Sequence, residues 1–196
     1  MALKTFVKIS GVNNLSDARY CAGMGVDFMG FDLEPESENY TDPEKFKEIS
    51  DWISGVDFVG EFGYSSIERV IKSLSTYNLA AVQSNYYDLL DDVQGAQTIL
   101  KVSIEDLANL PFNLNADFLL IQSTTTLSLT QRQNVKERVG RTKVLLDCNV
   151  KADTVEGLLE STGAHGISLT AGDEIRPGYK DYDELADILE ALETDD

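Results

Sequence analysis

Short apolar runs alternate with amphipathic stretches along the whole chain. The apolar runs predict eight strands, at residues 6–10, 26–31, 57–62, 79–83, 97–102, 117–122, 142–147 and 165–169. Apolar residues spaced three and four positions apart predict a helix after each strand, at residues 16–23, 43–53, 67–74, 86–91, 104–110, 128–139, 154–160 and 182–192. Apolar strands that each precede a helix are typical of a parallel sheet covered by helices.

Two architectures accommodate this order of elements, an open doubly wound sheet and a closed eight-stranded barrel. An open sheet of eight strands would be unusual for 196 residues, and its first turn often carries a glycine-rich nucleotide loop. The first turn here reads Gly11-Val12-Asn13-Asn14, which is no such loop. We therefore predict an α/β fold, a single-domain parallel βα (TIM) barrel over residues 1–196, with a frayed acidic tail at 193–196.

Local signals predict where individual helices begin and what they bury. Ser16 is the predicted N-cap of the first helix, because its hydroxyl can accept a hydrogen bond from the first turn. Pro43 suits the first position of the second helix. In that helix Phe46, Ile49 and Trp52 are predicted to face the core.

The charge balance narrows the range of partners. The formal net charge is −18. A protein that binds nucleic acids or anionic membranes needs a basic surface patch, which this charge disfavours. No apolar run approaches the roughly 18 residues of a membrane-spanning helix. We predict no nucleic-acid or membrane partner, and an anionic ligand only where the site is locally positive.

The cysteines and the N-terminus indicate a cytoplasmic protein. Cys21 and Cys148 fit no metal or redox spacing, so two reduced thiols are expected. A strand starts close to Met1, so no signal peptide is expected. We predict no cofactor and no metal, and the sequence leaves the oligomeric state open.

Polar residues stand at the predicted carboxyl ends of the strands, which form the mouth of a barrel where active sites lie. They are Lys8, Ser10, Asp32, Glu61, Gln83, Lys101, Gln122, Asp147 and Ser168. Glu61, Lys101 and Asp147 could form an acid/base site. Alternatively, these residues pair with one another and fill the barrel as a polar plug, since a buried lysine requires a counter-charge. The single histidine, His165, begins a strand at the opposite face and is predicted to be structural.

Several motifs resemble those of phosphoribosylanthranilate isomerase, an enzyme family of tryptophan biosynthesis. Lys8-Ile9-Ser10-Gly11 is similar to the first-strand motif Lys-Ile-Cys-Gly of that family. Further segments resemble the family in order along nearly the whole chain, at residues 25–31, 37–44, 59–62, 82–85 and 172–181. The resemblance implies the same barrel and an aldose–ketose type of isomerisation of a phosphorylated aminoribose.

The two proton-transfer positions of the family are replaced. The family's general base, a cysteine, corresponds to Ser10, and its general acid, an aspartate, corresponds to Gln122. A serine hydroxyl is too weak an acid to rest as an alkoxide, and an amide has no proton to transfer near neutral pH. Losing one such group typically costs about 10²–10⁴ in rate.

The positions that the resemblance assigns to substrate binding are altered too. The family's loop arginine falls on Asn39, and its fourth-strand histidine falls on Asn85. The glycine pair that approaches phosphate after the seventh strand is replaced within Asp147-Cys148-Asn149-Val150. Ala171 and Gly172 keep the small residues needed for the other half of a phosphate cradle.

Three functions remain open from the sequence. The first is a catalytically impaired family member that retains at most the binding of a small molecule, which could be phosphorylated. The second is an active isomerase of phosphoribosylanthranilate, or of a related small sugar phosphate, that uses Glu61, Lys101 or Asp147 instead. The third is a non-catalytic structural or partner-binding subunit.

Overall fold

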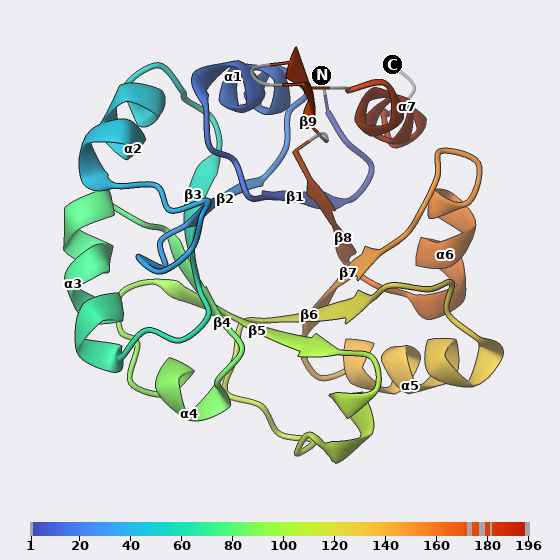
Figure 1. Cartoon of the computed structure of the whole chain (residues 1–196). Helices are drawn as coiled ribbons and strands as arrows, with labels where there is room; N and C mark the ends of the chain where they lie inside the picture. The colour runs from blue at the N-terminus through green and yellow to red at the C-terminus, as the bar shows by residue number, and fades with distance from the viewer. Residues whose placement is uncertain (1, 172–173, 177–178, 181, 195–196) are drawn as a thin grey trace.

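Eight parallel strands close into a barrel in the order in which they occur along the chain. We analysed a computed structural model, which describes residues 2–171, 174–176, 179–180 and 182–194. Figure 1 shows the strands as an inner ring and the helices as an outer ring. The strands are β1 (Phe6–Ser10), β2 (Phe28–Asp32), β3 (Asp57–Phe62), β4 (Ala81–Ser84), β5 (Gln97–Ser103), β6 (Phe118–Ser123), β7 (Lys143–Cys148) and β8 (Gly166–Thr170). The barrel and its single domain are as predicted, with each strand boundary within two residues.

The helices follow the strands in alternation. They are α1 (Leu15–Gly23), α2 (Pro43–Ser50), α3 (Ile67–Tyr77), α4 (Tyr87–Leu90), the 3₁₀ helix η1 (Asp106–Asn109), α5 (Leu129–Val139), α6 (Val155–Thr162) and α7 (Asp183–Ala191). The segment between β8 and α7 adds an antiparallel pair, β9 (Glu174–Arg176) and β10 (Tyr179–Lys180), which the sequence pattern did not predict.

Two local predictions were wrong. The N-cap of α1 is Asn14, whose side chain accepts a hydrogen bond from the Asp17 amide, so the helix begins one residue before Ser16. Trp52 is 67% exposed, because α2 ends at Ser50 and the tryptophan lies in the following turn. There it lies beside the Arg19 guanidinium, 5.3 Å from the ring centre.

The barrel separates two apolar cores. The inner core lies inside the barrel and is formed by Phe6, Phe28, Val59, Ala81, Ile99, Phe118, Leu120 and Leu145. Its three phenylalanine rings pack with centres 4.8–5.5 Å apart. The outer core lies between the strands and the helices. The inner core occupies the lower part of the barrel, so the polar strand ends above it form a separate layer.

The two ends of the chain meet beside α1 and α7 (Figure 1). The Lys4 amide donates to the Leu192 carbonyl at 2.8 Å, and the Thr194 amide donates to the Ala2 carbonyl at 3.0 Å. Leu3 pairs with Glu193 in an antiparallel bridge. The prediction of a frayed tail was therefore wrong for residues 193 and 194, while 195 and 196 lie outside the described residues.

Candidate functional site

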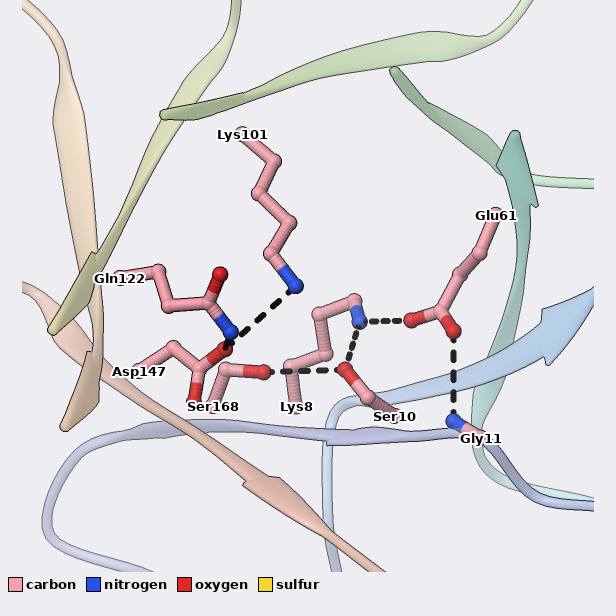
Figure 2. A network of polar contacts seen from close by, with 8 residues as sticks. All are labelled: Lys8, Ser10, Gly11, Glu61, Lys101, Gln122, Asp147 and Ser168. Carbon is pink, nitrogen blue, oxygen red and sulfur yellow. Dashed lines mark hydrogen bonds and ion pairs between the residues drawn. The ribbon is translucent and has the colours of Figure 1, made fainter. Parts of the chain in front are cut away.

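The register of the strands places the polar strand ends inside the barrel mouth. Asp32 is paired with Glu61, and Glu61 with Gln83, so these three side chains point to the same side of the sheet. Lys8 and Ser168 are register partners in the same way, and so are Gln122 and Asp147. Contacts across the barrel mouth form two clusters of polar side chains, which Figure 2 shows side by side.

The first cluster is enclosed and centres on Lys8, whose side chain has no exposed surface. Its ammonium group forms an ion pair with Glu61 Oε1 and donates to Ser10 Oγ at 2.5 Å. Glu61 Oε2 accepts the Gly11 amide at 3.2 Å, and Ser10 Oγ lies 3.2 Å from Ser168 Oγ. We call these five residues the lysine cluster (Figure 2).

Gly30 provides the space for this ion pair. A Cβ atom at Gly30 would lie 2.3 Å from Glu61 Oε1 and 3.1 Å from Lys8 Nζ. Any larger residue would therefore displace the Glu61 carboxylate from the lysine. The small residue in the middle of β2 is thus explained by the cluster that it faces.

The surroundings of Glu61 within the lysine cluster favour its ionised form. Burial by itself raises the pKa of the Glu61 carboxyl, but Lys8, together with smaller contributions from Ser10 and Lys101, outweighs burial and holds the pKa below its ordinary value of 4.5. Glu61 is therefore ionised near neutral pH and keeps a counter-charge beside Lys8. The Ser10 hydroxyl accepts a hydrogen bond from Lys8 and also interacts with the Glu61 carboxylate.

The second cluster lies on the other side of the mouth and is more open. Gln122 Nε2 donates to Asp147 Oδ2 at 3.1 Å, and Lys101 Nζ lies 3.6 Å from the same oxygen. The side chains of Lys101 and Asp147 are 26% and 30% exposed. In Figure 2 the Lys101 side chain extends from β5 toward the space between the two clusters.

A cavity of about 480 Å³ lies beside the second cluster, between the ends of β6, β7 and β8 and the start of α7. A volume of this size suits a small-molecule ligand. The described residues that line it are Gln122, Ser123, Thr124, Asp147, Cys148, Asn149, Val150, Ser168, Leu169, Thr170, Glu184, Leu185 and Ile188. The cavity therefore combines carboxylates, hydroxyls and amides with an apolar wall from α7.

Cys148 reaches the cavity wall but is a poor nucleophile. Burial raises the pKa of its thiol to about 11, and the neighbouring Asp147 carboxylate acts in the same direction. Cys21 is buried against the outer core, and neither cysteine forms a disulfide bond in the described part of the chain. Among the residues that the structure describes, no group of three His, Cys, Asp or Glu side chains is placed to hold a metal ion.

The residues that the family resemblance assigned to substrate binding do not gather at the cavity. Asn39 and Asn85 are exposed in the loops after β2 and β4, and neither lines the cavity. The Ala171 amide donates to the Ser10 carbonyl at 3.3 Å, so this N–H group is occupied by the chain itself. Gly172 lies outside the described residues.

The sequence reasoning missed Glu184 and Glu34. Glu184 lies in the first turn of α7 and borders the cavity; an acidic residue there looks like an ordinary helix start from sequence alone. Glu34 is buried, and its Oε2 accepts the amides of Gly63, Tyr64 and Ser65 at 2.7–3.0 Å. No local signal connects a loop residue after β2 with the backbone that follows β3.

His165 lies away from this site, as predicted. It precedes β8 at the opposite end of the barrel, and its Nδ1 accepts the Val144 amide at 3.1 Å. Among the described residues, no helix is long and apolar enough to cross a membrane.

Comparison with known proteins supports the resemblance seen in the motifs. No protein-family model matches the chain. The N-(5'-phosphoribosyl)anthranilate isomerase of Gloeothece citriformis is 25% identical over 210 aligned positions, which cover 95% of this chain and 93% of the relative. The enzyme of the same name from Thermotoga petrophila is 26% identical over 202 positions, covering 93% and 96%.

Solved structures of the same name share the fold. The phosphoribosyl anthranilate isomerase of Thermotoga maritima superposes with a TM-score of 0.78 at 22% identity, covering 96% of this chain and 98% of the other. A second isomerase structure, in complex with reduced 1-(o-carboxyphenylamino)-1-deoxyribulose 5-phosphate, gives a TM-score of 0.77 with the same coverage. Along nearly its whole length the chain is therefore similar in sequence to curated phosphoribosylanthranilate isomerases, and it shares the barrel fold of their solved structures.

Proposed function

We propose that the chain is a diverged, catalytically impaired barrel of this family that binds a small molecule in its mouth cavity. The observation that carries the proposal is the state of the two positions where the family places its base and acid. Ser10 accepts a hydrogen bond from a protonated lysine, and Gln122 is an amide that donates to Asp147. Neither side chain can take up or release a proton near neutral pH.

The lysine cluster does not supply a substitute base. Lys8 Nζ forms an ion pair with Glu61 and donates a hydrogen bond to Ser10 Oγ, so it is placed as a donor toward Ser10 and not as a base. Glu61 is held by Lys8 and by the Gly11 amide, so both of its oxygens are engaged. The cluster therefore supports the polar-plug interpretation of Lys8, Ser10 and Glu61.

A second candidate, an active isomerase that uses other mouth residues, is favoured by one observation. Asp147 borders the cavity and lies beside Lys101, so a carboxylate and an ammonium group stand together at the cavity edge. Such a pair could exchange a proton with a sugar carbon and a ring oxygen. We rank it second because Asp147 is already engaged with Gln122 and Lys101. A structural or partner-binding role stays a prediction.

The direct test is complementation of a tryptophan auxotroph that lacks this isomerase, together with kinetics of the purified protein. We expect no growth without tryptophan, and kcat/KM at least about 10²-fold below that of the Thermotoga maritima enzyme assayed in parallel, because two proton-transfer groups are replaced. Growth at the normal rate would overturn the proposal. Loss of that growth in Asp147→Asn would then favour the second candidate.

A double variant, Ser10→Cys with Gln122→Asp, separates the two sources of impairment. A thiol at position 10 would lie beside the Lys8 ammonium, which lowers thiol pKa values. Isomerase activity in this variant would assign the loss to proton transfer alone. Continued inactivity would assign it to substrate binding as well. The two single variants are the matched controls.

The surroundings that we propose are cytoplasmic. This proposal is supported by the two cysteines, Cys21 and Cys148, which are buried and not joined in a disulfide, as in proteins of a reducing compartment.

A further inference from the structure

Two carboxylates line the mouth cavity. Asp147 stands at the end of β7, and Glu184 stands in the first turn of α7. Among the described residues that line the cavity, none is a lysine or an arginine. The ammonium group of Lys101 does not line the cavity directly but lies 3.6 Å from Asp147 Oδ2. One lysine against two carboxylates leaves the cavity with a negative balance.

Asp147 is oriented and still able to accept further donors. The Gln122 amide and the Lys101 ammonium both approach Oδ2, whereas no described residue donates a hydrogen bond to Oδ1. The side chain is 30% exposed at the cavity. A carboxylate fixed through one oxygen and open at the other suits recognition of an N–H or O–H donor.

The same surroundings disfavour a phosphate group. A dianion would meet two carboxylates in a chain whose formal net charge is −18. The Ala171 amide, which could have supported an anion, donates to the Ser10 carbonyl instead.

Neutral polar groups complete the lining. Asn149 and Thr170 border the cavity beside Asp147, and Ser168 links it to the lysine cluster. Hydroxyl and amide side chains of this kind recognise ligand hydroxyl groups. We infer that the cavity binds a small hydroxyl-bearing amine, such as an amino sugar, rather than a phosphate ester. The inference rests on the proposed ligand-binding function and names the chemical class of its ligand.

Three sugars that share a glucose ring and differ in charge test the inference. Glucosamine is cationic at neutral pH, glucose is neutral and glucose 6-phosphate is anionic. Each is titrated into the ¹⁵N-labelled full chain while the backbone amide resonances are followed, and the amides of Asn149, Thr170 and Glu184 report on the cavity. We expect saturable shifts with glucosamine, weaker binding of glucose and no saturable shift with glucose 6-phosphate.

Variants assign the binding to the two carboxylates. Asp147→Asn and Glu184→Gln keep the shape of the side chain and remove its charge. Each is expected to weaken glucosamine binding by roughly two- to fivefold, the range of a partly exposed ion pair. Glu160→Gln removes an exposed carboxylate on α6 outside the cavity lining and should leave the affinity unchanged.

Three results would overturn the inference. These are tighter binding of glucose 6-phosphate than of glucosamine, unchanged glucosamine affinity in both carboxylate variants, and no saturable glucosamine shift at the cavity amides. Isomerase activity of the unaltered chain would instead overturn the proposed loss of catalysis. The two failures are therefore distinguished by separate measurements.

Discussion

Lys8 is fully enclosed, and its charge is balanced within the barrel by Glu61. At the scale of single residues, this pair explains why position 30 holds a glycine. Lys8 also donates a hydrogen bond to the Ser10 hydroxyl. Burying two charges costs free energy, and the ion pair with its hydrogen bonds offsets that cost. Removing one partner is therefore far more harmful than removing both.

A double-mutant cycle tests this coupling. Glu61→Gln leaves the enclosed ammonium of Lys8 without a counter-charge and should lower the free energy of unfolding by about 3–5 kcal/mol. Lys8→Met combined with Glu61→Gln should lose less than the sum of the two single changes, because no charge then remains buried. Urea unfolding measures all four proteins, and strictly additive losses would contradict the coupling.

At the scale of elements, the helices begin at different kinds of cap. Ser128 and Gln131 form a reciprocal capping box at the start of α5, so the side chain of each residue bonds the backbone of the other. Ser66 occupies the equivalent position of α3, but its side chain makes no capping hydrogen bond. The two serines look alike in sequence and differ in what they contribute.

This difference gives a paired prediction. Ser128→Ala removes a hydrogen bond to the first turn of α5 and should lower the free energy of unfolding by about 1 kcal/mol. Ser66→Ala is the matched control and should change it by less than about 0.5 kcal/mol. Chemical denaturation of both variants measures the difference, and equal losses would show that the capping box adds nothing.

Glu34 links two loops at the mouth, because its carboxylate accepts three consecutive amides that follow β3 and the Ser65 hydroxyl. Burial by itself raises the pKa of this carboxyl, but these hydrogen bonds outweigh it and hold the pKa below the ordinary value of 4.5. The stabilisation is therefore complete above about pH 4.5 and is lost as the pH falls through the lower, folded-state pKa.

A pH series tests this link. Glu34→Gln should be less stable than the unaltered chain near neutral pH by about 1–3 kcal/mol, since it weakens charge-assisted hydrogen bonds. The deficit should shrink below pH 4.5, where the unaltered chain loses the same contribution. Thermal unfolding across the pH range provides the measurement, and a deficit that stays constant into the acid range would refute the assignment.

At the scale of the whole molecule, the charge of −18 acts against compactness. Salt screens this repulsion, with a Debye length of about 10 Å at 0.1 M. We expect the unfolding midpoint to rise between low ionic strength and about 0.2 M potassium chloride. Chloride is preferable to sulfate, which stabilises proteins by exclusion from their surface. A midpoint that falls with salt would mean that attractive ion pairs outweigh the overall repulsion.

The sequence by itself determined the barrel, the order of its elements and the resemblance to the isomerase family. Strand and helix periodicities are local, and parallel strands that alternate with helices leave few ways to bury both faces of a sheet. The prediction that Ser10 and Gln122 replace the catalytic pair also comes from the sequence alone, because it depends only on the identity of residues at motif positions.

Only the tertiary structure decided which mouth residues form the enclosed lysine cluster and which ones line the cavity. The strand register encloses Lys8 with Glu61 and directs Asp147 toward a cavity. A shift of one residue would have pointed these side chains to the opposite face of the sheet. Glu184 and Glu34 gained their roles from segments distant in sequence, which no local pattern connects. The physical reason is that pairing and burial of charges depend on distances across the barrel, whereas periodicity reports only which face of an element is apolar.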